Sequence, residues 1–212
     1  MKKLLISCLL IFNFNLSFAQ NEKYIELMEE TITLMDTAET MNTLQQAASL
    51  FERIGNKMQT EWLPYYYSAY CYAQISHKEK EDKKKDLYVD KAEEFIGIAD
   101  KINPENSEIY VMKGFILQAR MNIDPMIRGF KYNSKCLKMF EKAMKLNPDN
   151  PRSYLWHGVN LYNTPSFFGG GKNKALPLLE NAIEKYNSFT PLNSIYPNWG
   201  KKYAEEMIIK CK

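Results

Sequence analysis

Apolar residues recur along this chain at steps of three and four, the spacing that places side chains on one face of an α-helix. Two segments carry a small residue, a bulky apolar residue four positions later and an alanine seven positions later. These positions are Ala92, Ile96 and Ala99 in one segment and Cys136, Phe140 and Ala143 in the other. Small residues let a neighbouring helix approach closely, and the bulky residue fills the gap beside it. The pattern therefore predicts packed helices.

The two segments belong to a longer internal repeat. Residues 101–115, KINPENSEIYVMKGF, match residues 145–159, KLNPDNPRSYLWHGV, after a shift of 44 positions. In both copies Asn-Pro predicts the end of a helix, because the residue before proline is pushed out of the helical region. A second helix follows, with a tyrosine and a glycine four positions apart. Glycine costs about 1 kcal/mol within a helix, which favours a packing role for Gly114 and Gly158.

These positions resemble the tetratricopeptide repeat family, in which an aromatic residue and a glycine mark the first helix, and A-x3-F-x2-A with a closing proline marks the second. The three clearest copies supply Tyr65, Ala69, Tyr72, Ala92, Ile96, Ala99 and Pro104, then Tyr110, Gly114, Leu117, Cys136, Phe140, Ala143 and Pro148, then Tyr154, Gly158, Leu161, Ala175, Leu179 and Ala182. A degenerate first copy is expected at Ala47, Phe51 and Ile54, paired with a helix near residues 22–37.

The resemblance implies an all-α solenoid of about four helical hairpins, with about nine helices and no sheet. The repeat domain is expected over residues 20–190, and residues 191–212 are expected to form a C-terminal capping helix. The small residues of the first and second helices stand 23, 22 and 17 positions apart, which is wider than in the family. This spacing predicts long loops within the hairpins.

In the resembled family, first-helix residues one and five positions after the large aromatic residue line a concave groove. The corresponding residues here, with others further along the same helices, are Tyr66, Tyr70, Val111, Phe115, Gln118, Leu155, Val159, Tyr162 and Asn163. Chaperone-binding members hold a peptide carboxylate with Lys and Asn, and this chain has neither at the positions one and five after the aromatic residue. We expect an apolar, aromatic groove that is either open to a partner or filled by long loops or the C-terminal helix.

The N-terminus has the order of a secretory signal peptide. Two lysines precede an apolar run that is too short to span a membrane, and residues 17–19, Ser-Phe-Ala, offer small residues at a cleavage site. We expect a signal peptide over residues 1–19, a mature chain from Gln20, and a periplasmic or secreted protein. The alternatives are a buried N-terminal helix and a lipoprotein anchored at Cys8.

Three cysteines remain after the leader, and an odd number without a C-x-x-C pair fits neither a disulfide framework nor a zinc site. Cys71 and Cys136 are expected to pack as small apolar residues, and Cys211 to be an exposed thiol near the C-terminus. Of the two histidines, His77 is expected in a charged loop and His157 in a packed helix. We expect no metal site.

The stretch SFFGGGKNK, residues 166–174, places three glycines before a lysine. A phosphate-binding P-loop requires G-x-x-x-x-G-K-[ST] between a strand and a helix, but serine and asparagine stand at two of these positions. We interpret the stretch as the turn inside the last hairpin, with glycines at positive φ and Phe167 and Phe168 anchoring the loop. Anion binding at Gly169–Gly171, beside Lys172, stays open as the alternative.

The net charge and the absence of known motifs argue against several classes of function. The net charge is +3, or +1 without the two leader lysines, which is too small for a nucleic-acid-binding face. The sequence has no G-x-S-x-G, no H-E-x-x-H and no recognisable Cys–His arrangement, so we expect neither catalysis nor a cofactor. We expect an exported scaffold that binds a protein or peptide segment through the groove. The alternative is an accessory periplasmic subunit of a solute-uptake system that holds a small ligand.

Overall fold

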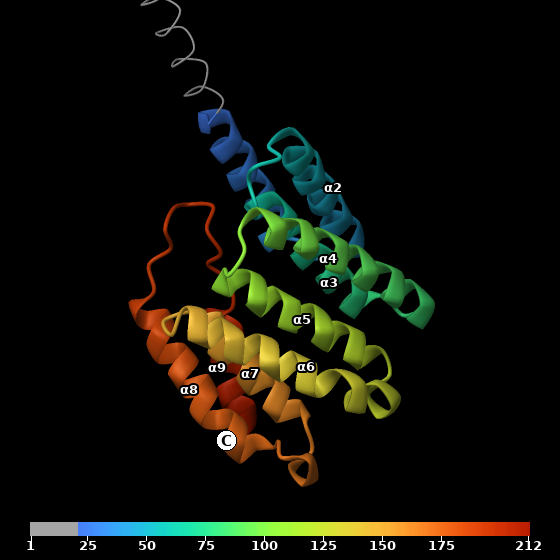
Figure 1. The fold of residues 1–212 in the computed structure, drawn as a ribbon, viewed down its shortest axis with the longest axis vertical. Helices are drawn as coiled ribbons and strands as arrows, with labels where there is room; N and C mark the ends of the chain where they lie inside the picture. Colours follow the sequence, from blue (N-terminus) through green and yellow to red (C-terminus); the bar gives the residue numbers. More distant parts are fainter. Residues whose placement is uncertain (1–20) are drawn as a thin grey trace, which may run out of the picture.

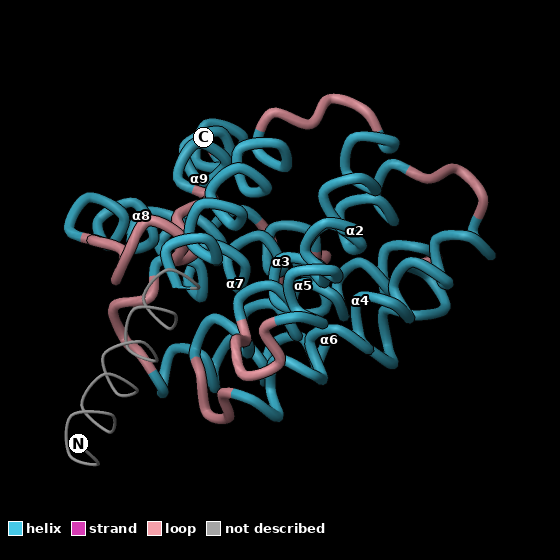
Figure 2. Tube along the Cα trace, turned by 90° about the horizontal axis from the view of Figure 1, so that it is seen from above, coloured by secondary structure: helices cyan, strands magenta, loops and turns pink. Residues whose placement is uncertain are grey.

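A computed structural model describes residues 21–212, and the expected signal peptide over residues 1–19 lies outside the described residues. Residues 21–36 are helical, and further helices follow to the C-terminus. They are α2 (Met41–Lys57), α3 (Leu63–Lys78), α4 (Asp82–Ile102), α5 (Ser107–Ile123), α6 (Pro125–Leu146), α7 (Pro151–Asn163), the short 3-10 helix η1 (Ser166–Phe168), α8 (Lys172–Ser188) and α9 (Lys201–Cys211). Within residues 21–212 there are nine α-helices and no strand (Figure 2), which confirms the all-α prediction.

Successive helices pack as hairpins, and the hairpins stack one upon the next (Figure 1). Helix α3 packs against α4, α5 against α6, and α7 against α8. The first helices of consecutive hairpins also touch, since α5 contacts both α3 and α7, and α7 contacts α9. Helices α3, α5 and α7 therefore form one layer of the solenoid, and α4, α6 and α8 form the other.

The repeated asparagines mark the helix ends. Asn106 and Asn150 are the N-caps of α5 and α7, and each side-chain oxygen accepts a hydrogen bond from the backbone N–H two residues later, at 2.8 and 3.0 Å. Asn103 and Asn147, which precede the prolines, are the C-caps of α4 and α6. Because both pairs are 44 positions apart, the two hairpins begin and end in register.

The small residues of the repeat lie where helices touch. Every residue expected to pack between the helices is buried, namely Ala69, Ala92, Ala99, Gly114, Cys136, Phe140, Ala143, Gly158, Ala175 and Ala182. A Cβ added at Gly114 would overlap the Phe140 ring, and one at Gly158 would lie 2.9 Å from Cγ of Leu179. Glycine at these two positions therefore allows α5 to contact α6, and α7 to contact α8, this closely.

The expected long loops are wrong for two of the three clear hairpins. Only residues 79–81 separate α3 from α4, and only Asp124 separates α5 from α6. The extra residues lengthen the second helices instead, to 21 residues in α4 and 22 in α6. In α4 they are rich in lysine, a good helix former, and Asp124 caps α6 by accepting a hydrogen bond from Ile127 N–H. Only the last of these hairpins keeps a longer connection, at residues 164–171.

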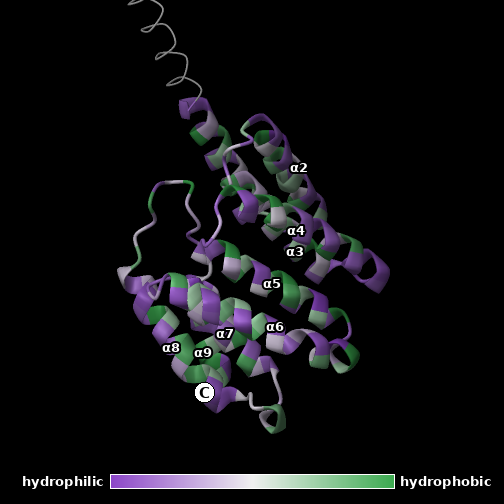
Figure 3. Ribbon diagram, viewed as in Figure 1, coloured by the Kyte–Doolittle hydropathy of each residue, from purple (hydrophilic) through white to green (hydrophobic). Residues whose placement is uncertain are grey.

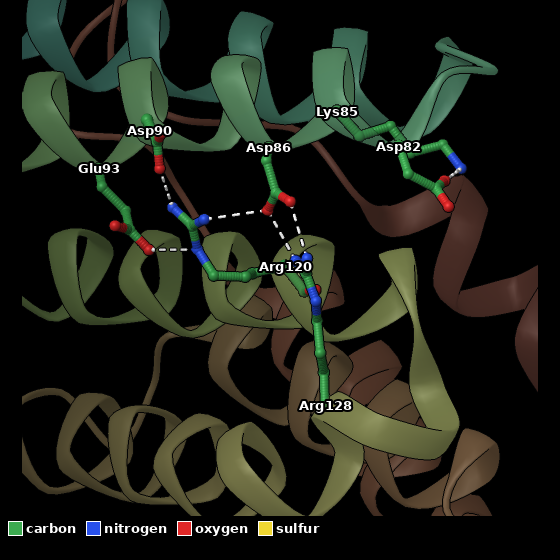
Figure 4. A network of polar contacts seen from close by, with 7 residues as sticks. All are labelled: Asp82, Lys85, Asp86, Asp90, Glu93, Arg120 and Arg128. Carbon is green, nitrogen blue, oxygen red and sulfur yellow. Dashed lines mark hydrogen bonds and ion pairs between the residues drawn. The ribbon is translucent and has the colours of Figure 1, made fainter.

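A network of ion pairs joins the lengthened helices to α5 (Figure 4). Arg120 of α5 donates to Asp86 and Asp90 of α4 at 3.1 and 2.5 Å, and its Nε donates to Glu93 at 3.0 Å. Arg128 of α6 donates two hydrogen bonds to Asp86, at 2.6 and 2.7 Å. These bonds from Arg128, together with the charge of both guanidinium groups, hold the pKa of Asp86 below its usual value. One carboxylate thus links three helices.

Residues 189–200 run from α8 back toward the N-terminal helices before α9 begins (Figure 1). The Tyr67 hydroxyl donates to the carbonyl of Ile195 at 3.0 Å, and the Trp199 indole N–H donates to the Tyr66 hydroxyl at 3.1 Å. Ile195 is buried in the core formed by the earlier helices, whereas α9 packs into a second core with α7 and α8. This segment therefore covers part of the face that α3 and α5 present.

The turn between α7 and α8 differs from the prediction in its side chains. Gly169 and Gly171 have φ of 86° and 102°, the positive values expected of glycine here. Phe167 and Phe168 are 90% and 56% exposed, so they do not anchor the loop. The backbone holds the turn instead, since Gly171 N–H donates to the carbonyl of Leu161 at 2.8 Å.

Two further expectations are wrong. Cys211 is buried rather than exposed, because α9 turns this side chain into the second core. His77 lies in the last turn of α3 rather than in a loop. His157 lies in α7 as expected, with its ring stacked 6.5 Å from that of Phe140. Across the described part of the chain, the helices are too short or too polar to cross a bilayer.

Candidate ligand pocket

Five aromatic side chains meet on the face formed by α3, α5 and α7. Tyr70, Phe115 and Trp156 come from these three helices, and Trp199 and Tyr203 approach from the C-terminal segment. The rings of Tyr70 and Trp199 stack with centroids 4.7 Å apart. Those of Phe115 and Trp156 are 4.4 Å apart, and Tyr203 lies 5.6 Å from Trp156. Such mutual contacts restrain the orientation of each ring.

These rings line a cavity of about 600 Å³, a size typical of sites for one small molecule. The other lining residues are Gln74, His77, Gln118, Met121, Asn122, Val159, Asn163, Gly200, Lys202 and Glu206. Gln118, Met121 and Val159 are buried, whereas the polar residues His77 and Lys202 are exposed. The cavity therefore has an aromatic and apolar floor with a polar rim.

Two buried polar atoms of the cavity wall have no hydrogen-bond partner within residues 21–212. They are Oε1 of Gln118 and Nε1 of Trp156. Gln118 is 4% exposed, and its Nε2 donates to the carbonyl of Trp156 at 3.4 Å, so only one end of this amide is bonded. A buried polar group without a partner costs about 1–3 kcal/mol, so a molecule in the cavity that bonded to these atoms would be stabilised.

Three ionisable groups of the cavity, His77, Tyr70 and Tyr203, are neutral near pH 7. The His77 ring lies 5.6 Å from that of Phe115, and partial loss of water lowers its pKa below the ordinary value of 6.5. Its imidazole is therefore neutral and retains a nitrogen lone pair. Burial raises the pKa of Tyr70 and of Tyr203, so both phenols keep their protons.

The predicted groove residues divide according to their place in the helix. Five line the cavity, and they are Tyr70, Phe115, Gln118, Val159 and Asn163. Tyr66, Val111 and Leu155 are fully buried, and Tyr162 packs against the second core. Positions five after the aromatic residue thus reach the cavity, whereas positions one after it are covered.

Sequence reasoning missed the residues that complete the cavity. Trp156, Trp199, Tyr203 and His77 are all lining residues that the groove prediction left out. Trp156 stands two positions after the aromatic residue of its repeat, and Trp199 lies outside the matched repeats. A tryptophan in a connecting segment was the one signal available, because such a large apolar side chain is seldom left in water.

Comparison with known proteins shows which solved structures have a similar fold. No protein-family model matches the chain, and a search of curated proteins also finds no match. HusA, a haemophore from Porphyromonas gingivalis, is similar in structure with a TM-score of 0.81 and 28% identity, over 89% of this chain and 92% of that chain. TTC0263, a TPR protein from Thermus thermophilus, gives a TM-score of 0.57 and 18% identity, over 89% of each chain.

The chain has the tetratricopeptide-repeat fold. This confirms the resemblance drawn from the repeated residues and the expected all-α solenoid. The similarity to HusA extends over nearly all of both chains.

Proposed function

We propose that this chain is an exported, non-catalytic binding protein that holds one flat, largely apolar small molecule. The observation that carries the proposal is the meeting of five rings, from three hairpins and the C-terminal segment, around a cavity of about 600 Å³. Aromatic side chains supply a large contact area with few rotatable bonds to restrict, so a rigid flat ligand gains the most from them.

The cavity favours the small-ligand alternative over peptide binding. An extended peptide needs a groove that is open along several hairpins, but residues 189–200 lie across that face. Trp199 stacks on Tyr70 and donates its indole N–H to Tyr66, so a peptide would have to break both contacts to enter. The space that remains suits a compact ligand.

Haem and related porphyrins are the ligand class that we propose. HusA, which is similar over 89% of this chain, is a haemophore. A porphyrin has two flat apolar faces and two carboxylates at one edge, which matches an aromatic floor and a polar rim. Lys202 lies at that rim and would pair with a carboxylate, while His77 and Met121 offer a nitrogen and a sulfur to the iron.

Titration with haemin and with iron-free protoporphyrin IX tests this proposal. Bound porphyrin should quench the fluorescence of Trp156 and Trp199, because both indoles line the cavity. Tyr203→Ser should weaken the binding of both compounds by about tenfold or more, since one wall is lost. Tyr132→Ser, on α6 outside the cavity lining, is the matched control and should bind as the unmodified chain does. Unsaturable quenching, or equal affinity of the two variants, would contradict the proposal.

The iron ligand needs a separate measurement. His77→Ala should shift the Soret band of bound haem and leave the affinity for iron-free protoporphyrin unchanged, because only the metal uses the imidazole. An unchanged Soret band would exclude His77 and direct attention to Met121.

Export is tested by the intact mass of the protein from its native envelope. The expected mature chain begins at Gln20 and has lost the segment with two lysines and an apolar run. A mass that retains residues 1–19 would contradict export by cleavage, and a diacylated Cys8 would replace it with the lipoprotein alternative.

A further inference from the structure

Five large apolar side chains protrude together where α6 begins and where the chain turns into α8; in Figure 3 both segments show green. Met126, Ile127 and Phe130 lie on one side of the first turns of α6, and Phe167 and Phe168 lie in η1. Their exposed fractions are 87%, 77%, 79%, 90% and 56% in that order. The Phe168 ring lies 5.6 Å from Phe130 and 5.3 Å from Phe167, so the five form one apolar patch.

The chain around the apolar patch carries positive charge. Residues 125–140 and 150–179 contain no Asp or Glu, although the whole chain has 25 acidic residues. The exposed lysines of these two segments that lie closest to the patch in sequence are Lys131, Lys135, Lys172 and Lys174. The patch is therefore flanked on both segments by cations that have no acidic neighbour along the chain.

Carboxylates near the start of α6 are already engaged. Asp124 accepts a hydrogen bond from Ile127 N–H at 3.1 Å as the N-cap of the helix. Asp86 of α4 is held between the guanidinium groups of Arg120 and Arg128. Both carboxylates thus bond within the protein, and the exposed charged residues that flank the patch along the chain are lysines, which attract an anionic surface.

The apolar patch also lies close to the cavity. Asn122 and Asn163 line the cavity at the ends of α5 and α7. Met126 and Phe167 each follow four positions later, a stretch of chain that spans at most about 14 Å. Both segments of the patch therefore begin within about 14 Å of a residue that lines the cavity.

We propose that the apolar patch inserts into the surface of a bilayer that contains anionic lipid, with the flanking lysines against the headgroups. Side chains this exposed protrude from the surface, and a fluid bilayer accepts protruding side chains without a complementary shape, whereas a folded partner must supply a matching pocket. Apolar burial and attraction of lysines to anionic lipid together provide the binding energy. Inserted in this way, the chain brings the rim of its cavity to the membrane, where an apolar ligand would be exchanged; this consequence alone depends on the proposed function.

Vesicle flotation tests the insertion. The chain from Gln20 contains every residue of both hydrophobic cores and is used without porphyrin. It is mixed with vesicles of phosphatidylcholine alone, and with vesicles that also contain about one third phosphatidylglycerol. We expect flotation with the anionic vesicles, weaker or no flotation with the neutral ones, and a loss as salt is added.

Matched variants locate the contact. Phe130→Ser combined with Phe167→Ser should lower the partition onto anionic vesicles by about tenfold or more. Leu192→Ser combined with Leu50→Ser removes exposed apolar side chains elsewhere, 79% and 37% exposed, and should float as before. Circular dichroism shows whether both variants keep their helices. If the serine variant loses helix, a second variant with Lys131→Glu and Lys172→Glu tests the same surface, and it should also weaken flotation.

Some outcomes would overturn the proposal. No flotation of the unmodified chain excludes the bilayer, and equal flotation of the two serine variants excludes this patch. The unmodified chain could instead fail to float and associate with itself as its concentration rises. If only the patch variant lost that association, the patch would be a contact with a second copy. The assay contains no porphyrin, so an absence of flotation would contradict the membrane proposal and not the proposed function. A chain that floats but binds no porphyrin would contradict only the proposed function.

Discussion

Glu108 and Arg152 form a buried bidentate ion pair although they occupy the same position in consecutive repeats. Nε and Nη2 of Arg152 donate to the two carboxylate oxygens of Glu108 at 2.8 and 2.7 Å. Glu108 is 1% exposed and Arg152 is 0% exposed. Each stands two positions after the N-cap asparagine of its helix, so the shift of 44 positions places an acid in α5 against a base in α7. The pair ties one hairpin to the next.

We predict that the costs of removing the two partners of this pair are not additive. Arg152→Met or Glu108→Leu leaves one charge buried without its partner, which should lower the free energy of unfolding by about 3–5 kcal/mol. The double variant replaces the pair by apolar side chains and should cost clearly less than the sum of the two. Urea unfolding of the four proteins measures the coupling. Additive costs would show that the two side chains do not stabilise each other.

Two glycines inside helices are predicted to respond to alanine in opposite ways. A methyl group at Gly114 would overlap the Phe140 ring, so Gly114→Ala should lower stability by about 1–3 kcal/mol. A Cβ at Gly97 meets no heavy atom within 4 Å, so Gly97→Ala should be neutral or stabilise by up to about 1 kcal/mol. Chemical denaturation measures the stability of both variants. A similar change in stability for the two would mean that α5 does not contact α6 as closely as described.

Stability is predicted to decrease as the pH falls from about 7 toward about 5. Loss of water around the rings lowers the folded-state pKa of His77 and of His157 below the ordinary value of 6.5. The unfolded chain therefore takes up protons at a higher pH than the folded chain, and this uptake favours unfolding as the pH drops through 6.5. Thermal melting across this range should show the decrease, and a variant with His77→Gln and His157→Gln should show a flatter profile. A slope that the double variant retains would assign the effect to other groups.

Substitutions of two cavity rings, Phe115 and Tyr203, are predicted to differ in their effects on stability and on ligand binding. Phe115 is 1% exposed, so Phe115→Ala leaves a void and should cost about 3–5 kcal/mol of stability. Tyr203 is only partly buried, so Tyr203→Ser should change the melting temperature much less while it weakens porphyrin binding. Melting curves measured beside the titrations decide this. A melting temperature that falls equally in both variants would make Tyr203 part of the core rather than of the binding surface.

The helices and their contacts could be predicted from the sequence because the signals that set them are local. Asparagine caps, prolines and the spacing of three and four each act within a few turns of helix. Gly114 and Gly158 identified two places where helices touch, and neither has room for a side chain. Tyr70 and Phe115, each five positions after the aromatic residue of a repeat, do line the cavity.

The burial of the Glu108–Arg152 pair could not be predicted in this way. In the sequence these residues look like ordinary surface charges at the start of a helix, where most such charges are solvated. Their burial depends on how α5 stacks on α7, and on the Phe189 ring that lies 4.6 Å from the guanidinium group. No local pattern contains that arrangement.

The sequence by itself therefore determined the order of the helices and the small residues at which they meet, because each depends on neighbours only a few positions away. It did not determine the lengths of α4 and α6, which extend where loops were expected. The tertiary structure alone decided the shape of the cavity. The capping helix expected over residues 191–212 forms only at Lys201–Cys211. Residues 189–200 instead cross the face of the earlier helices and bring Trp199 to Tyr66 across 133 positions of the chain. Contacts over such a separation depend on which surfaces remain to be covered once the hairpins have stacked, and that is a property of the packed molecule rather than of any segment.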